Sequence, residues 1–257
     1  MSPFSLVGVI HLPPLPGAAN FQNFDIRKLA REAARGAQTL VDCGFTHVMI
    51  QDGQDFPQPT LAHQGTIASM SAIGLQVREA ISVPLGVIVG HNDGPGSVAI
   101  AKAIAADFVR VKTLTGIASG PNGFIEGCAT QVALTKQLLK SDVEVWADAQ
   151  EATSIPLVAD KVLAARYAVD FGGANRVIVT SDAGPDVAAD EIAQMRASLK
   201  GQTDYIIGGR VTLGNFATVI GQVDGVIIGS AISSKSNDGT LIDEDTARKF
   251  GEILQAS

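Results

Sequence analysis

Two turns near the end of the chain have the residue types of a phosphate-binding site. The first turn ends the segment DYIIGGR at 204–210, and the second ends the segment DGVIIGS at 224–230. Glycine lets the backbone approach an anion closely, and the exposed N–H groups at the start of a helix attract negative charge. Glycine turns between a strand and a helix also arise for packing reasons alone. The predicted phosphate-binding residues are Gly208, Gly209, Arg210, Gly229 and Ser230.

Polar side chains also stand at the ends of the other short apolar runs. Aspartate and histidine can act as general acids or bases, and lysine can attack or bind a carbonyl or phosphate group. The predicted catalytic residues at these ends are Asp52, His91, Lys112 and Asp148. Three further polar residues are predicted to bind substrate together with the glycine turns, namely His11, Asn92 and Asp182.

Each of these positions has a structural interpretation as well. Asp52 precedes a glycine, and Asp-Gly is a common turn dipeptide. The segment HNDG at 91–94 is turn-like too, and Asp182 precedes the turn residues Ala-Gly-Pro. Aspartate and asparagine are good helix N-caps. His11 stands before a proline-rich loop, where it could serve as a hydrogen-bonded anchor.

The position of Lys112 has two readings, because Arg110 lies two residues before it. Alternate residues of a strand share a face, so Arg110 and Lys112 point one way and Val109 and Val111 the other. If the charged pair faces the inside of a barrel, Lys112 lies in the mouth and Arg110 needs a partner one layer deeper. There the lysine can form a Schiff base or bind a phosphate or carboxylate. If the valines face inward, both cations are solvated or packed under a helix.

These residues are positioned by eight short apolar runs that alternate with longer helical segments. The predicted strands are 6–10, 46–50, 85–89, 108–111, 143–147, 176–179, 205–207 and 226–228. The predicted helices are 25–43, 70–81, 97–105, 122–139, 154–171, 188–199, 213–219 and 243–255, the last with Asp243 as N-cap. Such alternation indicates a parallel sheet. No G-x-G-x-x-G follows the first strand, which disfavours a Rossmann fold.

The predicted fold is therefore α/β, a (β/α)₈ TIM barrel that spans residues 1–257 as a single domain. The length of 257 residues fits one such barrel, and no linker divides the chain. In this fold the active site lies where strands give way to the following loops, and the loops after strands 7 and 8 often bind phosphate.

Composition and residue spacing argue against several classes of partner. The net charge of −7, with no cluster of Lys and Arg, argues against nucleic-acid binding. Cys43 and Cys128 match no metal or disulfide spacing, and we expect both to be buried. No cofactor is evident, although carboxylates and two histidines at one rim could hold a divalent metal. No signal peptide or membrane anchor is recognisable, so we expect a cytoplasmic protein.

Six segments resemble the BtpA family, which includes the SgcQ-type proteins. The first is the fairly specific opening GVIHLPPLPG at 8–17. The others are FVRVKTLTG at 108–116, the Glu-Gly pair at 126–127, WAD at 146–148 and the two glycine segments. The resemblance covers essentially the whole chain and implies a (β/α)₈ barrel. It also implies a link to photosystem I biogenesis or, for SgcQ-type members, to sugar-phosphate metabolism.

The chain departs from the family pattern at two places. After Asp148 the family typically carries a Lys and a His, whereas this chain reads AQEATS at 149–154. The acidic residue expected after the second strand is represented by Gln51 and Asp52. These departures bear on any chemistry that relies on a lysine or histidine after the fifth strand.

Three functions follow from these observations. The first is an enzyme, a lyase, isomerase or transferase, that acts on a small phosphorylated, sugar-phosphate-like metabolite. The second, by family analogy, is a non-catalytic biogenesis or stability factor for a membrane complex such as photosystem I, with peripheral membrane association. The third is a sensor of a phosphorylated ligand that has lost the chemistry. For each function we expect a homo-oligomer.

Overall fold

Eight short, buried strands pair in parallel and close into a barrel in the computed structural model, which describes residues 3–23, 25–121, 123–199, 203–234 and 241–257. The barrel strands, in spatial order, are β1 Ser5–His11, β2 His47–Gln51, β3 Leu85–Ile88, β4 Phe108–Val111, β7 Glu144–Asp148, β9 Arg176–Val179, β10 Asp204–Gly208 and β11 Gly225–Ile228. The last strand pairs with the first, with Ser5 opposite Gly225. The predicted TIM barrel and all eight predicted strands are thereby confirmed.

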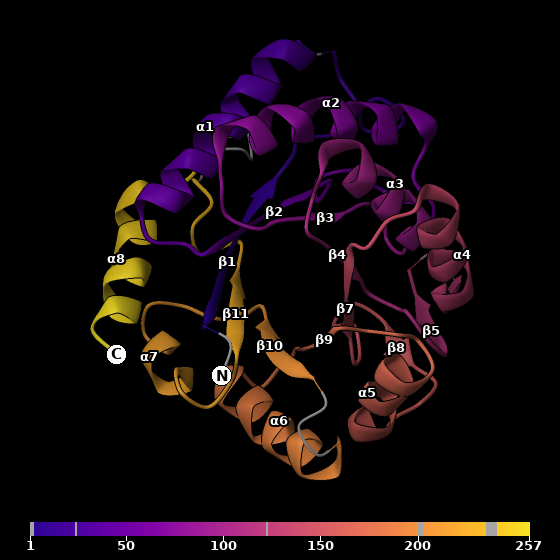
Figure 1. Ribbon diagram of the computed structural model, residues 1–257, viewed down its shortest axis with the longest axis vertical. Helices are drawn as coiled ribbons and strands as arrows, with labels where there is room; N and C mark the ends of the chain where they lie inside the picture. Colours follow the sequence, from indigo (N-terminus) through magenta and orange to yellow (C-terminus); the bar gives the residue numbers. More distant parts are fainter. Residues whose placement is uncertain (1–2, 24, 122, 200–202, 235–240) are drawn as a thin grey trace.

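Helices surround the barrel and cover the outer face of its strands (Figure 1). They are α1 Ile26–Asp42, α2 Gln64–Ala80, α3 Gly94–Ile104, α4 Ala129–Leu139, α5 Lys161–Asp170, α6 Pro185–Leu199, α7 Phe216–Val219 and α8 Glu244–Gln255. Asp243 caps α8 as predicted, since its side chain accepts from the Thr246 N–H. Helix α2 begins six residues before the predicted start, at Gln64. None of the helices in the described ranges is long and apolar enough to cross a membrane.

Two of the predicted helices were too long. Residues 123–126, inside the predicted helix 122–139, form strand β6 (Gly123–Glu126), and residue 122 lies outside the described residues. Within the predicted helix 154–171, β8 (Ile155–Pro156) precedes α5. Both strands pair antiparallel with β5 (Ile117–Gly120) in a small separate sheet. β6 pairs with the adjacent β5 as a hairpin, whereas β8 pairs with β5 across more than thirty residues, and the local helical periodicity of these segments indicates neither pairing.

The barrel interior is filled by one inward-facing apolar layer, to which every strand contributes. Its members are Val7, Val9, Met49, Ile88, Phe108, Trp146, Ile178, Ile206 and Ile227. The alternate residues of the same strands, such as Val109 and Val177, pack with the helices instead. Because side chains alternate along a strand, residues two positions beyond this layer also face inward, at the carboxyl-terminal mouth. The apolar layer therefore forms the floor of the mouth.

Below this layer, at the amino ends of the strands, a polar cluster closes the barrel. Arg176 lies 4.7 Å over the Trp146 ring and donates to Ser5 Oγ at 2.8 Å. The ring of His47 packs against Phe108 and Trp146, and its Nδ1 lies 2.9 Å from Thr46 Oγ1. Burial, reinforced by the charge of Arg176, lowers the pKa of His47 to about 4. This base gives the barrel a titratable group far from the mouth.

Candidate functional site

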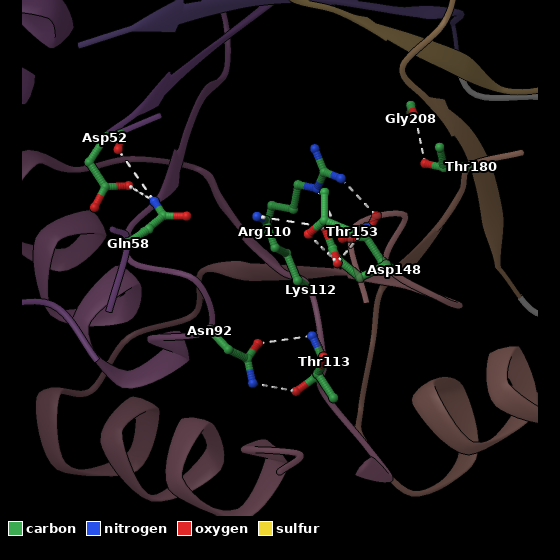
Figure 2. Close-up of polar contacts among 11 residues, drawn as sticks. Asp52, Gln58, Asn92, Arg110, Lys112, Thr113, Asp148, Thr153, Thr180 and Gly208 are labelled. Carbon is green, nitrogen blue, oxygen red and sulfur yellow. Dashed lines mark hydrogen bonds and ion pairs between the residues drawn. The ribbon is translucent and has the colours of Figure 1, made fainter. Parts of the chain in front are cut away.

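The mouth of the barrel carries a buried ion pair between neighbouring strands. Arg110, at the inward face of β4, donates from Nε to Asp148 Oδ2 at 3.0 Å and from Nη2 to Oδ1 at 2.8 Å (Figure 2). The Asp148 side chain is fully buried, and the Arg110 side chain is 16% exposed. Burial acts to lower the pKa of Arg110, but the charge and hydrogen bonds of Asp148 outweigh it and raise that pKa. Of the two orientations open for β4, the charged residues face inward.

Lys112 lies one layer above Arg110, and its nearest carboxylate comes from the loop after β7. Its Nζ is 3.7 Å from Glu151 Oε1, and the two side chains are 11% and 6% exposed. Burial, opposed by the charge of Glu151, lowers the pKa of Lys112 below that of an ordinary lysine. Of the two placements left open for Lys112, the structure has the one in the mouth.

Glu151 is held in place by Thr153. The Thr153 N–H donates to Oε2 at 2.8 Å, and its hydroxyl lies 2.8 Å from both carboxylate oxygens. Burial acts to raise the pKa of Glu151, but the charge of Lys112 and the bonds from Thr153 together lower it. The mouth thus contains a fixed, ionised carboxylate facing a loosely paired lysine.

Asp52 contributes a third buried carboxylate, directly after β2. Its Oδ2 accepts from the Gly90 N–H at 2.8 Å, and its Oδ1 lies 3.3 Å from Gln58 Nε2 (Figure 2). Burial is the main reason that the pKa of Asp52 rises to about 6, with the charge of Asp55 acting in the same direction. A carboxyl with a pKa near 6 can exchange protons close to neutral pH.

His91 and Asn92 stand side by side after β3 but have different surroundings. His91 Nε2 is buried and has no hydrogen-bond partner within the described part of the chain. Burial, reinforced by the charge of Lys112, lowers the pKa of His91, so the ring is neutral at pH 7. The Asn92 amide instead exchanges two 2.9 Å hydrogen bonds with the Thr113 backbone (Figure 2). Asn92 thereby connects the loops that follow β3 and β4.

His11 ends β1 and lies between two glycines. A Cβ added to Gly229 would lie 2.9 Å from His11 Nε2, and one added to Gly53 would lie 2.7 Å from Nδ1. Burial, together with the positive charge of Arg110, lowers the pKa of His11. The imidazole is therefore neutral, and glycine at both positions makes room for it.

The two predicted phosphate turns lie next to each other, since β10 and β11 are hydrogen-bonded neighbours in the barrel. Gly209 and Arg210 have φ of 91° and 59°, in the left-handed region. Gly208 itself is buried, and its carbonyl accepts from the Thr180 hydroxyl (Figure 2). Arg210 is 55% exposed and pairs with Asp182, which is 73% exposed. Gly229 and Ser230 follow β11 directly, with Ser230 exposed.

Glu151 and Thr153 belong to the site but were not among the residues predicted from the sequence. Both lie in the loop after β7, beside the predicted Asp148, and Glu151-Ala-Thr153 is a short segment able to form such local bonds. Only closure of the barrel brings the Glu151 carboxylate to Lys112. A small pocket with a free volume of about 30 Å³ lies at this point, lined by residues that include Lys112, Asp148, Glu151 and Tyr167. The described residues contain no group of His, Cys, Asp and Glu that could hold a metal ion.

The sequence matches one known family over nearly its whole length. The model of the BtpA family covers residues 4–256. An uncharacterized protein of Thermococcus kodakarensis is 33% identical over 97% of this chain and 95% of that protein. The Photosystem I biogenesis protein BtpA of Synechocystis sp. is 26% identical over 97% of this chain and 87% of that protein.

Solved structures show the same fold at low sequence identity. A structure of native KDPGal aligns with a TM-score of 0.60 and 14% identity, over 100% of this chain and 97% of that chain. Phosphoribosylanthranilate isomerase from Thermotoga maritima aligns with a TM-score of 0.56 and 11% identity, over 98% of this chain and 100% of that chain. At such identities the likeness concerns the barrel, and the chemistry has to be argued from the site.

Proposed function

The chain belongs to the BtpA family, and we propose that it is an enzyme acting on a small phosphorylated metabolite, similar to a sugar phosphate, at the carboxyl-terminal mouth of its barrel. The observation that carries this proposal is the buried group of charged side chains at the mouth: Asp52, Arg110, Lys112, Asp148 and Glu151. Burying charges costs free energy of folding, and proteins concentrate such groups where chemistry needs them.

We assign the phosphate to the adjoining turns after β10 and β11. Gly209 has a positive φ and an open space where a side chain would be, so an anion can approach its backbone. The left-handed backbone of Arg210 is unfavourable for a residue with a side chain, and such strain is common at ligand sites. Ser230 and the Arg210 guanidinium supply exposed donors on the two turns.

The reacting part of the substrate would lie across the mouth, against Lys112, Asp52 and His91. Asp52, with its pKa of about 6, and the neutral His91 are suited to general acid and base roles. Both oxygens of Asp148 accept hydrogen bonds from Arg110, so Asp148 positions the Arg110 guanidinium group and contacts no substrate itself. The arrangement suits a lyase, an isomerase or a transferase. The Thermotoga maritima isomerase acts, by its name, on a phosphoribosyl compound within the same fold.

A second function is favoured by the name of one relative. The Synechocystis protein is called a photosystem I biogenesis protein and is similar along 97% of this chain. A biogenesis factor would bind a membrane complex and turn over no small molecule. Co-sedimentation with photosystem I membranes, together with the absence of any phosphorylated ligand, would favour this function over the enzyme.

Thermal unfolding in the presence of phosphorylated compounds tests the enzyme proposal directly. The ligands are inorganic phosphate, dihydroxyacetone phosphate and ribose 5-phosphate at millimolar concentration, with and without Mg²⁺, against dihydroxyacetone and ribose. A ligand present at ten times its Kd stabilises by about 1.4 kcal/mol, or roughly 3 to 6 °C in Tm. A shift seen only with the phosphorylated compounds supports the phosphate site. Equal behaviour of both sets of compounds contradicts it.

The same preparation addresses the assembly of the protein. We expect a cytoplasmic homo-oligomer, and light scattering after size exclusion measures its mass. A monomer at micromolar concentration would contradict this part of the proposal.

A further inference from the structure

Lys112 differs from the other buried and half-buried lysines in how its ammonium group is satisfied. Lys136 donates to the Val143 carbonyl at 2.6 Å. Lys161 donates to the Thr180 carbonyl at 3.0 Å and to both oxygens of Glu191 at 2.8 and 2.9 Å. Within the described part of the chain, Lys112 has only the 3.7 Å ion pair with Glu151, a separation beyond a hydrogen bond. Its Nζ is therefore left available in the mouth.

The groups around Lys112 have the arrangement that an amine nucleophile needs. Glu151 is fixed by Thr153, so a carboxylate able to accept a proton stays beside the ammonium group. His91 Nε2 is buried without a partner, and its pKa responds to the charges of Lys112 and Glu151. An imidazole nitrogen in that state can give a proton to, or take one from, a bound group.

A small pocket adjoins Lys112. Lys112, Asp148 and Glu151 line it, and its free volume of about 30 Å³ is room for a small group the size of a water molecule. Buried lysines near a second cation and in a low-dielectric site are the ones that proteins use as neutral amines, and Arg110 is that second cation one layer below. A purely structural lysine in this position would be expected to form the close, multiple bonds that Lys161 forms.

We infer that Lys112 is a nucleophile that forms an imine with the open-chain carbonyl group of the phosphorylated substrate. The inference rests on the proposed function, and it narrows the substrate to a phosphorylated ketone or aldehyde. Glu151 accepts the proton that leaves the Lys112 ammonium group, and His91 transfers protons to and from the oxygen of the substrate carbonyl group.

Imine formation at Lys112 passes through a carbinolamine. The neutral Lys112 Nζ adds to the carbonyl carbon, forming a C–N bond while the C=O π electrons move to oxygen, and proton transfer from nitrogen to oxygen gives a neutral carbinolamine. A proton from a neighbouring acid then lets the hydroxyl leave as water, as the nitrogen lone pair forms the C=N bond. The product is a protonated iminium, which withdraws electrons from the adjacent carbon. No oxidant, reductant or metal is required.

Trapping with sodium borohydride tests the inference. The protein is mixed with dihydroxyacetone phosphate, glyceraldehyde 3-phosphate or ribose 5-phosphate, reduced, and mapped by peptide mass spectrometry. Hydride reduces an imine to a stable secondary amine, so the expected result is a covalent adduct on Lys112. Absence of an adduct at Lys112 with all three compounds overturns the inference.

Matched variants separate the imine from simple phosphate binding. Lys112→Arg keeps a cation for Glu151 but cannot form an imine, so the adduct is lost. Lys161→Arg changes the tightly paired lysine of α5, and its trapping is expected to match the unaltered protein. Glu151→Gln is expected to slow trapping at least about tenfold, as loss of a general base does. Trapping at the normal rate in Lys112→Arg would show that another amine reacts and would overturn the inference.

The thermal measurement keeps the two proposals distinct. If dihydroxyacetone phosphate raises Tm but leaves Lys112 unmodified after reduction, the phosphate site stands and the imine is wrong. If no phosphorylated compound raises Tm and no adduct forms, both proposals are wrong.

Discussion

Arg110 and Asp148 form a bidentate ion pair across the adjacent strands β4 and β7, with N–O distances of 2.8 and 3.0 Å. Arg110 is opposite Trp146 in the strand register, so the pair lies on the aromatic floor of the mouth. The two charges of this pair neutralise each other beneath Lys112 and Glu151, which lie one layer closer to the opening of the barrel. Replacing either partner alone leaves a buried charge without compensation.

Asp148→Asn is therefore expected to lower the free energy of unfolding by about 3 kcal/mol, as for other broken buried pairs. The double variant Arg110→Met, Asp148→Leu removes both charges and should recover most of that loss while abolishing ligand binding. Urea unfolding measures the stability of both variants, and calorimetry measures ligand binding by the double variant. If the Asp148→Asn protein is as stable as the unaltered protein, the ion pair of Arg110 and Asp148 does not stabilise the fold.

Gly229→Ala is expected to displace His11, because the added Cβ would lie 2.9 Å from His11 Nε2. Overpacking of this kind costs about 1 to 3 kcal/mol of stability. We also expect about tenfold weaker binding of dihydroxyacetone phosphate, a loss of about 1.4 kcal/mol in binding free energy. Gly214→Ala is the control, since its nearest new contact is Thr212 Oγ1 at 3.8 Å. If calorimetry shows the two variants binding alike, His11 and Gly229 are not part of the phosphate site.

Asp182→Asn is expected to strengthen binding of phosphorylated ligands. The Asp182 carboxylate competes for the Arg210 guanidinium, and both side chains are more than half exposed. Exposed pairs are worth about 0.2 to 1 kcal/mol, so the gain in affinity should be about 1.4- to fivefold. High salt should erase the gain through screening. Weaker binding in Asp182→Asn would indicate that Asp182 itself contacts the ligand.

His47 is expected to make the barrel less stable as the pH falls from about 6.5 to 4. Burial keeps its folded-state pKa at about 4, whereas the unfolded chain takes up the proton near 6.5. The unfolded state then binds more protons in this window, so stability falls with decreasing pH, by up to about 3 kcal/mol. His47→Gln should flatten this part of the profile when urea unfolding is followed at several pH values. An unchanged slope would mean that the ring titrates normally.

Asp52 is expected to have the opposite effect on stability. Its folded-state pKa of about 6 lies above the value of 3.8 for an unperturbed carboxyl, so the folded state binds more protons between these values. Stability therefore falls as the pH rises through this window, by up to about 3 kcal/mol. Asp52→Asn keeps an acceptor for the Gly90 N–H and should be more stable than the unaltered protein at pH 8 but not at pH 4. Equal stability of the two at pH 8 would contradict the raised pKa.

The barrel could be predicted from the sequence because its strands are local signals. Each strand is buried on both faces and reads as a short apolar run, and each is followed by an amphipathic segment. The small sheet of β5, β6 and β8 could not be predicted in this way. Its strands are short, and although β5 and β6 form a local hairpin, β8 pairs with β5 more than thirty positions away, as Ile155 does with Ser119.

At the site, the sequence by itself determined which polar residues stand at the ends of the strands, among them His11, Asp52, Lys112 and Asp148. The tertiary structure decided what each of them meets. Strand alternation left two orientations for Arg110 and Lys112, and only the pairing of β4 with β7 turned them inward to Asp148 and Glu151. The side chains that neutralise one another belong to different strands, and the sequence of one strand carries no information about its neighbour in a closed barrel.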